Sequence, residues 1–174
     1  MIWSARFCHS AILSVLLLSA CSEPIPSPPH CRSSVILEQH EATGAGCVIT
    51  ASKQLLVIHH RLSGKFDIPA GGVNDNESLA CAAHRETFEE TGLNVAVIDF
   101  LGTTDSGLAL FSCMPSGGLL PEKYPTLPVP DWATTEVDGI EWIDPFTLRH
   151  ENWRYPDQLV EVRDAFVVAS KQQK

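Results

Sequence analysis

The sequence feature that most restricts the fold is a helical pattern over residues 77–91, whose acidic side chains gather near one end. Residues three and four apart on a helix share a face, so the carboxylates of Glu86, Glu89 and Glu90 are expected to cluster. They occupy the last turns, where the helix dipole already presents negative potential. A fold that contains this helix therefore has to bring a cation to its acidic end.

The acidic surface of this helix continues its apolar surface. At about 100° per residue, one arc of roughly 100° contains both kinds of side chain, namely those of Leu79, Ala82, Ala83, Glu86 and Glu90. A solvated acidic face would lie opposite the apolar one, so these carboxylates are expected to point into a cleft beside Gly71 and Gly72. An all-oxygen carboxylate cluster suits a hard divalent cation, Mg²⁺ or Mn²⁺.

The composition limits the size of the fold and the class of partner. The chain of 174 residues is 44% hydrophobic and 19% charged, which is enough apolar material for one domain of ordinary size. Lysine and arginine number 12 against 21 aspartate and glutamate residues, for a formal net charge of -9. No broad basic surface is available to neutralise nucleic-acid phosphates, so we expect no nucleic-acid partner.

The remaining pattern predicts strands around the acidic helix. Runs of aliphatic and β-branched residues predict strands at residues 35–38, 45–50, 54–60, 95–101, 108–113 and 139–143. Residues 69–72 predict a loop, Asn74 or Asn76 is available as the N-cap of the first helix, and Gly92 as its C-terminal cap. Residues 157–170 predict a second amphipathic helix. Together these elements predict a mixed α/β sandwich.

Seven residues in and before the acidic helix stand at a characteristic spacing: Gly71, Glu77, Arg85, Glu86, Glu89, Glu90 and Gly92. This run resembles the Nudix box, Gly-x5-Glu-x7-Arg-Glu-U-x-Glu-Glu-x-Gly-U, in which U is apolar. All seven fixed residues are present, and Thr87 at the first U position is the mildest departure. The resemblance covers roughly residues 35–170 and implies a single-domain Nudix α/β/α sandwich with a mixed sheet.

The resemblance implies a Nudix pyrophosphohydrolase, which hydrolyses a nucleoside diphosphate linked to another moiety with Mg²⁺ or Mn²⁺ as cofactor. Its substrate is then a small-molecule diphosphate, attacked by water at phosphorus. Glu86 and Glu90 correspond to the principal metal ligands, and the Gly71 carbonyl to a further one. Glu89 corresponds to a further ligand or to the catalytic base. Pro69-Ala70-Gly71 is similar to the lead-in of some ADP-ribose and sugar-nucleotide pyrophosphatases.

Other residues of the box have supporting roles in this family. By resemblance, Arg85 is expected to orient a glutamate rather than to bind the substrate. Glu77 is expected to have a structural role or a place behind the metal ligands, and Gly92 to end the helix. The alternative function is a non-catalytic Nudix-fold binding or regulatory module. Such a module is expected to have lost a box glutamate, and none is lost here.

A catalytic base is often contributed by a loop after the box. Glu136 is the first choice, followed by Asp131, Asp138 and Asp105, although a solvated loop carboxylate is the alternative for each. The proline-containing segment 115–132 carries Tyr124 and Trp132, which could stack on a substrate or form a rigid surface excursion. Four further residues at or after the end of a predicted strand lie near the box and could contact phosphate: His59, His60, Arg61 and Lys65.

The first residues resemble a bacterial lipoprotein signal peptide at residues 1–20. An apolar run at residues 11–18 is too short to span a membrane, and Leu18-Ser19-Ala20-Cys21 resembles the lipobox. The resemblance implies lipid attachment at Cys21 and, because Ser22 follows, the periplasmic face of the outer membrane in a double-membraned bacterium. A plain signal peptide with a chance cysteine and an uncleaved anchor are the alternatives.

The predicted tether and domain follow this segment. Residues 21–32 contain four prolines and predict an extended tether of roughly 28 Å, before the domain at residues 33–174. An oxidising compartment would leave four cysteines free to pair: Cys31, Cys47, Cys81 and Cys113. Four cysteines allow three pairings, and buried free thiols are the alternative for Cys47 and Cys113.

Overall fold

The computed structural model describes residues 24–37 and 41–172, and confirms the predicted α/β sandwich with a mixed sheet in one domain. Two α-helices accompany the sheet in this part of the chain, α1 (Leu79–Thr91) and α2 (Leu159–Gln172). The strands are β1 (Gly44–Ala51), β2 (Gln54–His60), β3 (Lys65–Asp67), β4 (Ala70–Gly72), β5 (Val95–Thr103), β6 (Leu108–Pro115), β7 (Thr126–Leu127) and β8 (Val137–Ile143). Short 3₁₀ turns, including Asp131–Ala133 and Pro156–Gln158, connect the later elements.

The sheet is built around β1. Its strand order is β5-β6-β1-β2-β8-β7, with β3 beside β2 and β4 beside β1. β1 and β6 run parallel, whereas β1 pairs antiparallel with β2 and β4. The central place of β1 agrees with its sequence of small and apolar side chains, and residues 45–50 are all buried.

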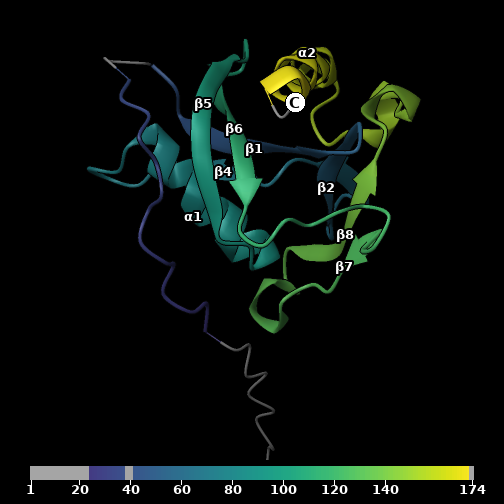
Figure 1. Cartoon of the computed structure of the whole chain (residues 1–174), viewed down its shortest axis with the longest axis horizontal. Helices are drawn as coiled ribbons and strands as arrows, with labels where there is room; N and C mark the ends of the chain where they lie inside the picture. The colour runs from purple at the N-terminus through teal and green to yellow at the C-terminus, as the bar shows by residue number, and fades with distance from the viewer. Residues whose placement is uncertain (1–23, 38–40, 173–174) are drawn as a thin grey trace, which may run out of the picture.

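The two helices cover opposite faces of the sheet, as Figure 1 shows. Successive side chains of a strand point to opposite faces, and β1 follows this rule: Ala45, Cys47 and Ile49 pack in the core on the α1 side, and Val48 packs in the core under α2. Burial of apolar area on both faces fixes α1 against β1 and so fixes the position of the box residues that α1 carries.

Two local predictions are wrong. Residues 69–72 do not form a loop, because Ala70–Gly72 adds a short strand to β1. The glycine backbone permits this close approach, since a Cβ on Gly44 would lie 2.9 Å from the Gly71 carbonyl oxygen. The strand predicted at residues 35–38 is absent at residues 35–37, although Val35 packs against the core. A single bridge, between Ser33 and Val97, lies just before this range.

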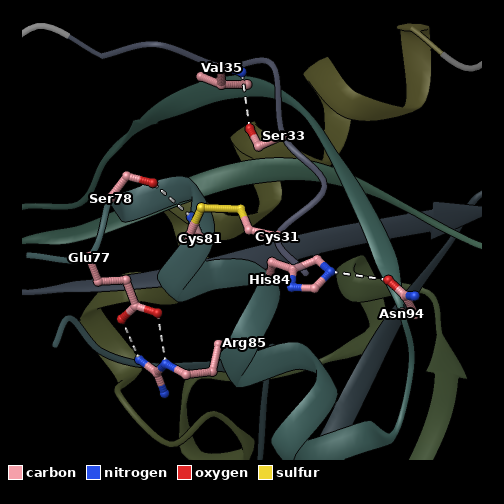
Figure 2. The surroundings of a disulfide bond; sticks show 9 residues. All are labelled: Cys31, Ser33, Val35, Glu77, Ser78, Cys81, His84, Arg85 and Asn94. Carbon is pink, nitrogen blue, oxygen red and sulfur yellow. Dashed lines mark hydrogen bonds and ion pairs between the residues drawn. A yellow bond between two sulfur atoms is a disulfide. The ribbon is translucent and has the colours of Figure 1, made fainter. Parts of the chain in front are cut away.

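The structure also selects the cysteine pairs. Cys47 of β1 and Cys113 of β6 form one disulfide between two neighbouring parallel strands. Cys31 and Cys81 form the second, which joins the segment before the sheet to the first turn of α1 (Figure 2). The sequence left all three pairings open because a pairing depends on which residues the topology brings together. None of the helices that the structure describes is long and apolar enough to cross a membrane.

Candidate active site

The loop before α1 places Glu77 outside the helix. The N-cap is Ser78, whose side chain accepts a hydrogen bond from the Cys81 amide at 3.2 Å. The N-cap predicted at Asn74 or Asn76 is therefore wrong: the Asn74 carbonyl accepts from the Glu77 amide in a turn, and Asn76 has a positive φ of 63°. At the other end Gly92 is a left-handed cap with φ 72°, as predicted. Because Glu77 precedes the helix, its carboxylate is free to turn toward Arg85.

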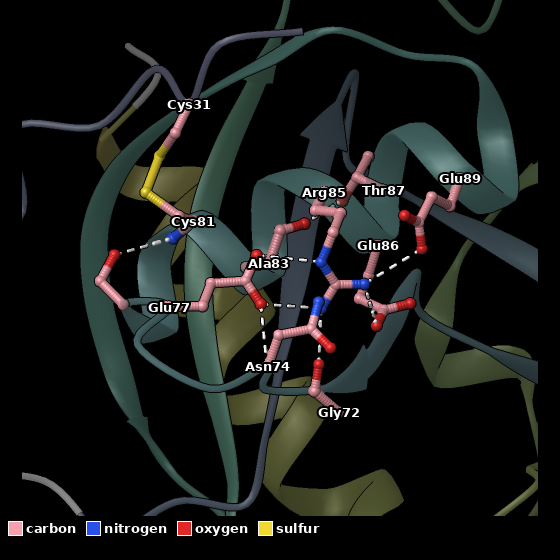
Figure 3. Close-up of polar contacts among 11 residues, drawn as sticks. Cys31, Gly72, Asn74, Glu77, Cys81, Ala83, Arg85, Glu86, Thr87 and Glu89 are labelled. Atoms are coloured by element: carbon pink, nitrogen blue, oxygen red, sulfur yellow. Dashed lines mark hydrogen bonds and ion pairs between the residues drawn. A yellow bond between two sulfur atoms is a disulfide. The ribbon is translucent and has the colours of Figure 1, made fainter. Parts of the chain in front are cut away.

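Arg85 contacts three of the four glutamates of the box (Figure 3). Its Nε and Nη2 atoms donate to the two carboxylate oxygens of Glu77, each at 2.9 Å. Nη1 donates to Glu86 at 2.6 Å and to Glu89 at 3.0 Å. Nη2 also donates to the Gly72 carbonyl at 2.7 Å. The guanidinium thus pairs bidentately with Glu77 and, through Nη1, contacts the two helix glutamates Glu86 and Glu89.

The pKa values of this pair follow from their contacts. The hydrogen bond to Glu77 is the main reason that the pKa of Arg85 is raised above its usual value. Burial alone would raise the pKa of Glu77, but hydrogen bonds with Arg85 and with the Asn74 backbone lower it overall. Both groups are therefore charged at neutral pH, and the pair is a fixed support for the helix glutamates.

Glu86 lies directly over the backbone of Gly71. A Cβ on Gly71 would lie 2.1 Å from the Glu86 carboxylate carbon, so only glycine leaves room for the observed side chain. Burial raises the pKa of Glu86, and Arg85 partly offsets the effect. The box glycine thus permits a half-buried carboxylate to lie against β4.

Glu90 is the most buried box glutamate, with 7% of its surface exposed. One of its oxygens accepts a hydrogen bond from the Ala70 amide at 2.9 Å. Burial raises the pKa of Glu90 well above its usual value, and the charges of Asp67 and Glu136 raise it further. Its hydrogen bond connects the end of α1 to the start of β4.

These residues line one cleft of about 640 Å³. Acidic side chains come from three places in the chain: Asp67, the α1 residues Glu86, Glu89 and Glu90, and Glu136. Of the four predicted bases after the box, Glu136 lies in this wall, whereas Asp105, Asp131 and Asp138 do not line the cleft. Trp132 also lines the cleft, stacks on Phe88 with ring centroids 5.8 Å apart, and donates to the Glu89 carbonyl at 3.0 Å. Tyr124 is exposed and does not line the cleft.

The two histidines at the end of β2 face partners other than the cleft. His59 Nε2 lies 2.5 Å from a Glu141 oxygen, and His60 Nδ1 lies 3.0 Å from the Ser63 hydroxyl. Neither histidine lines the cleft, nor do Arg61 and Lys65.

Several residues of the cleft escaped the sequence analysis. Arg154 lies 3.7 Å from the Asp67 carboxylate and is the sole lysine, arginine or histidine among the described residues of the cleft wall. Tyr155 and Gln158 follow it along the same wall. No periodic pattern marks these residues, since they lie in a stretch of short 3₁₀ turns and bends between β8 and α2. Asp67 also escaped the sequence analysis, because a single acidic residue before the box belongs to no recognisable pattern.

Asp67 is expected to make the stability of the protein depend on pH. Burial raises the pKa of Asp67 to about 7 from its ordinary value of 3.8, with Arg154 opposing the change. The folded state therefore keeps a proton that the unfolded state loses. The stabilisation is complete below pH 3.8 and is lost as the pH rises to about 7, up to about 4 kcal/mol. We expect Asp67→Asn to flatten the fall in unfolding free energy between pH 5 and pH 8, measured by urea denaturation in chelator. An equal slope in both proteins would contradict the assignment.

The cleft carboxylates fit a hard divalent cation by their chemistry. Across residues 24–37 and 41–172, no group of three or more His, Cys, Asp or Glu side chains stands in a metal-holding arrangement. Arg85 donates a hydrogen bond to Glu86, and the Ala70 amide donates one to Glu90. Glu86 is a half-buried acid and Glu90 a buried one, and burial and neighbouring acidic groups raise the pKa values of both. Oxygen donors that repel one another in a cleft are the donors that Mg²⁺ or Mn²⁺ prefers.

Comparison with known proteins identifies the family. The family model of the NUDIX domain matches residues 40–161, most of the chain. The chain belongs to the NUDIX family. The complete box predicted from the sequence is therefore part of a NUDIX domain, and α1 is the box helix of this family member.

Individual relatives of this NUDIX protein are distant. A MutT-like protein from Streptomyces ambofaciens is 30% identical over 111 residues, which are 61% of this chain and 65% of that protein. The chain thus spans just under two thirds of that relative's length. An ADP-ribose pyrophosphatase from Streptococcus suis 89-1591 superposes with a TM-score of 0.58 at 14% identity, covering 75% of this chain and 92% of that one. A UDP-X diphosphatase superposes with a TM-score of 0.60 at 13% identity, covering 80% of this chain and 67% of that one. At these identities the two structures share the fold.

Proposed function

We propose that this NUDIX protein is a divalent-metal-dependent hydrolase. It cleaves the diphosphate linkage of a nucleoside diphosphate joined to another moiety, or of a related organic diphosphate. The observation that carries the proposal is the convergence of Glu86, Glu90 and Glu136 in one cleft beside Gly71. The names of the pyrophosphatase and the diphosphatase that share its fold support the reaction class.

The side chains of the cleft have different roles in the proposed reaction. Glu86 and Glu90 would hold Mg²⁺ or Mn²⁺, with the Gly71 carbonyl as a further ligand and Glu89 as either a further ligand or the base. When bound, the ion neutralises diphosphate charge and lowers the pKa of water. Arg85 keeps Glu86 and Glu89 oriented through its hydrogen bonds.

The proton of the attacking water has two possible acceptors in the cleft. Glu136 and Glu89 both line it, and either carboxylate could take the proton as water attacks in line at one phosphorus. The bond between that phosphorus and the bridging oxygen then breaks, so each product carries a phosphate group and one of them carries the oxygen of water.

Charge explains why the reaction needs a metal. The net charge is -9, and Arg154 alone among the lysine, arginine and histidine residues that the structure describes reaches the cleft wall. Arg154 already faces Asp67 at 3.7 Å. A diphosphate would therefore meet a negative cleft unless a divalent ion neutralised it.

Metal removal tests this proposal. The oxidised protein would be assayed on nucleotide sugars, dinucleoside polyphosphates and lipid diphosphates, with Mg²⁺, Mn²⁺ or EDTA. We expect at least one compound to release phosphorylated products with either ion, EDTA to abolish the release, and excess ion to restore it. Absence of turnover across the panel, together with thermal stabilisation by one of its compounds, would instead favour a binding module.

We also propose that Cys21 carries a lipid outside the cytoplasmic membrane. Residues 1–23 lie outside the described part, so the support comes from elsewhere in the chain. Two disulfides are typical of an oxidising compartment. Loss of membrane association in Cys21→Ser, together with loss of palmitate labelling, would support the anchor, and unchanged fractionation would contradict it.

The segment predicted to be a free spacer is partly joined to the domain. Cys31 is bonded to α1, and Ile25 lines the cleft. Ile25 follows Cys21 by only four residues, a span of at most about 14 Å. A lipid on Cys21 would therefore hold the cleft near the membrane surface, rather than roughly 28 Å away. This geometry favours substrates at the membrane surface.

A further inference from the structure

The N-terminal arm, residues 24–31, forms part of the cleft wall. The chain before the sheet runs beside α1 (Figure 1, purple), and Ile25 of this arm lines the same cleft as Glu89 and Trp132. Ile25 is 53% exposed, so its apolar side chain is available to a ligand. It carries no charge and cannot hold the diphosphate itself. Whatever Ile25 contacts must be the part of the substrate beyond the phosphates.

Three contacts, made by Cys31 and by the next residue, Arg32, fasten the far end of the arm. The Cys31–Cys81 disulfide attaches it to the first turn of α1, with the two Cα atoms 5.3 Å apart (Figure 2). The Arg32 carbonyl accepts a hydrogen bond from the Val97 amide at 2.8 Å. The Arg32 guanidinium also donates to the Ser116 hydroxyl. The arm is therefore tied both to the helix that carries the box and to β5.

The proline-rich composition makes the arm stiff, so its attachment at Cys31 also positions Ile25 in the cleft. Four of its eight residues are proline: Pro24, Pro26, Pro28 and Pro29. Proline favours an extended chain of about 3.1 Å per residue, so the six steps from Cys31 to Ile25 span about 19 Å. The helix rises about 17 Å from Cys81 to Gly92. The arm is thus long and stiff enough to reach the acidic end of α1 from its attachment at Cys81.

We propose that Ile25 is a specificity-determining residue of the substrate site and that the Cys31–Cys81 disulfide positions it there. The inference rests on the proposed function and names a finer property of the substrate: an apolar or planar surface next to the diphosphate. A planar nucleobase and an apolar chain both provide such a surface. Inorganic pyrophosphate provides none, so Ile25 does not affect its binding.

Calorimetric binding to the full chain tests this inference. Three probes would be titrated with Mg²⁺ present: inorganic pyrophosphate, ADP-ribose and geranyl diphosphate. The variants are Ile25→Ala and the double variant Cys31→Ser/Cys81→Ser, with Ile36→Ala as a matched control. Ile36 is 91% exposed and does not line the cleft. Thermal denaturation checks that each variant is folded, and Ile25→Ala removes only an exposed side chain.

The expected result is selective. Ile25→Ala and the double variant should weaken the binding of ADP-ribose or geranyl diphosphate by about fourfold or more, the effect of roughly one buried methylene. Pyrophosphate binding and the Ile36→Ala control should stay unchanged. The two organic probes distinguish a planar partner from an apolar chain.

Two other outcomes would overturn the inference, and they separate it from the proposed function. If wild-type protein binds an organic probe and Ile25→Ala binds it equally well, Ile25 does not determine specificity and the proposed function is untouched. If Ile25→Ala weakens the binding of pyrophosphate to the same degree as that of the organic probe, the Ile25 side chain does not act on the moiety beyond the diphosphate. If the wild-type protein binds none of the three probes, the proposed function and the inference are both overturned.

Discussion

Gly71→Ala should lower diphosphate turnover by about a hundredfold or more, because the new methyl group would occupy the place of the Glu86 carboxylate. A Cβ at this position would lie 2.1 Å from the carboxylate carbon and 2.3 Å from both of its oxygens. Glu86 would have to leave its position and its hydrogen bond with Arg85 at 2.6 Å. A displacement of about 1 Å at a reacting centre typically costs about a hundredfold in rate. Steady-state kinetics on the best compound of the panel measure the effect.

The adjacent glycine provides a matched control. A Cβ on Gly72 would meet nothing within 4 Å. Its carbonyl accepts a hydrogen bond from Arg85, and Gly72→Ala leaves that carbonyl in place. We therefore expect near wild-type turnover from Gly72→Ala. Equal losses in both alanine variants would mean that backbone freedom, rather than room for Glu86, explains the requirement for Gly71.

Glu90→Gln should lower metal-dependent turnover by orders of magnitude while the protein stays folded. Glutamine has the same shape and can still accept the hydrogen bond that Ala70 donates to Glu90 at 2.9 Å. It replaces an acid that is costly to ionise in this buried position beside Asp67 and Glu136, so the free energy of unfolding should stay equal or rise. The loss is therefore chemical, because an amide is a poor ligand for a hard cation. Kinetics with Mg²⁺ and urea denaturation in chelator measure the two effects.

An exposed glutamate provides the control for this substitution. Glu151 pairs with Arg149 on the surface, with 63% of its side chain exposed. Glu151→Gln should leave both turnover and stability near the wild-type values, since exposed ion pairs contribute little. Retained turnover in Glu90→Gln would mean that the carboxylate cluster does not bind the essential metal.

The part of the site that depends on local spacing was predictable from the sequence. Helical periodicity placed Glu86 and Glu90 on one face with the small side chains of Ala82 and Ala83, and in the structure that face is turned inward. The left-handed cap at Gly92 followed from residue type alone. These features need only contacts between neighbours in the chain.

The features that depend on distant contacts were not predictable. β4 exists because Gly71 lies across from Ala45 of β1, and a loop was expected there. The disulfide partners depend on which strands are adjacent. Arg154 reaches the cleft because the chain before α2 passes Asp67 of β3. None of these pairings leaves a periodic signal in the sequence.

The measurement that most directly tests metal-dependent attack on a diphosphate is hydrolysis in water labelled with oxygen-18. The compound of the panel that turns over fastest would be hydrolysed with Mg²⁺, and the products examined by mass spectrometry. The expected result is one labelled oxygen in the phosphate group of a single product, with no reaction in EDTA. Label in a sugar or alcohol product, or an undiminished rate in EDTA, would contradict the proposed chemistry.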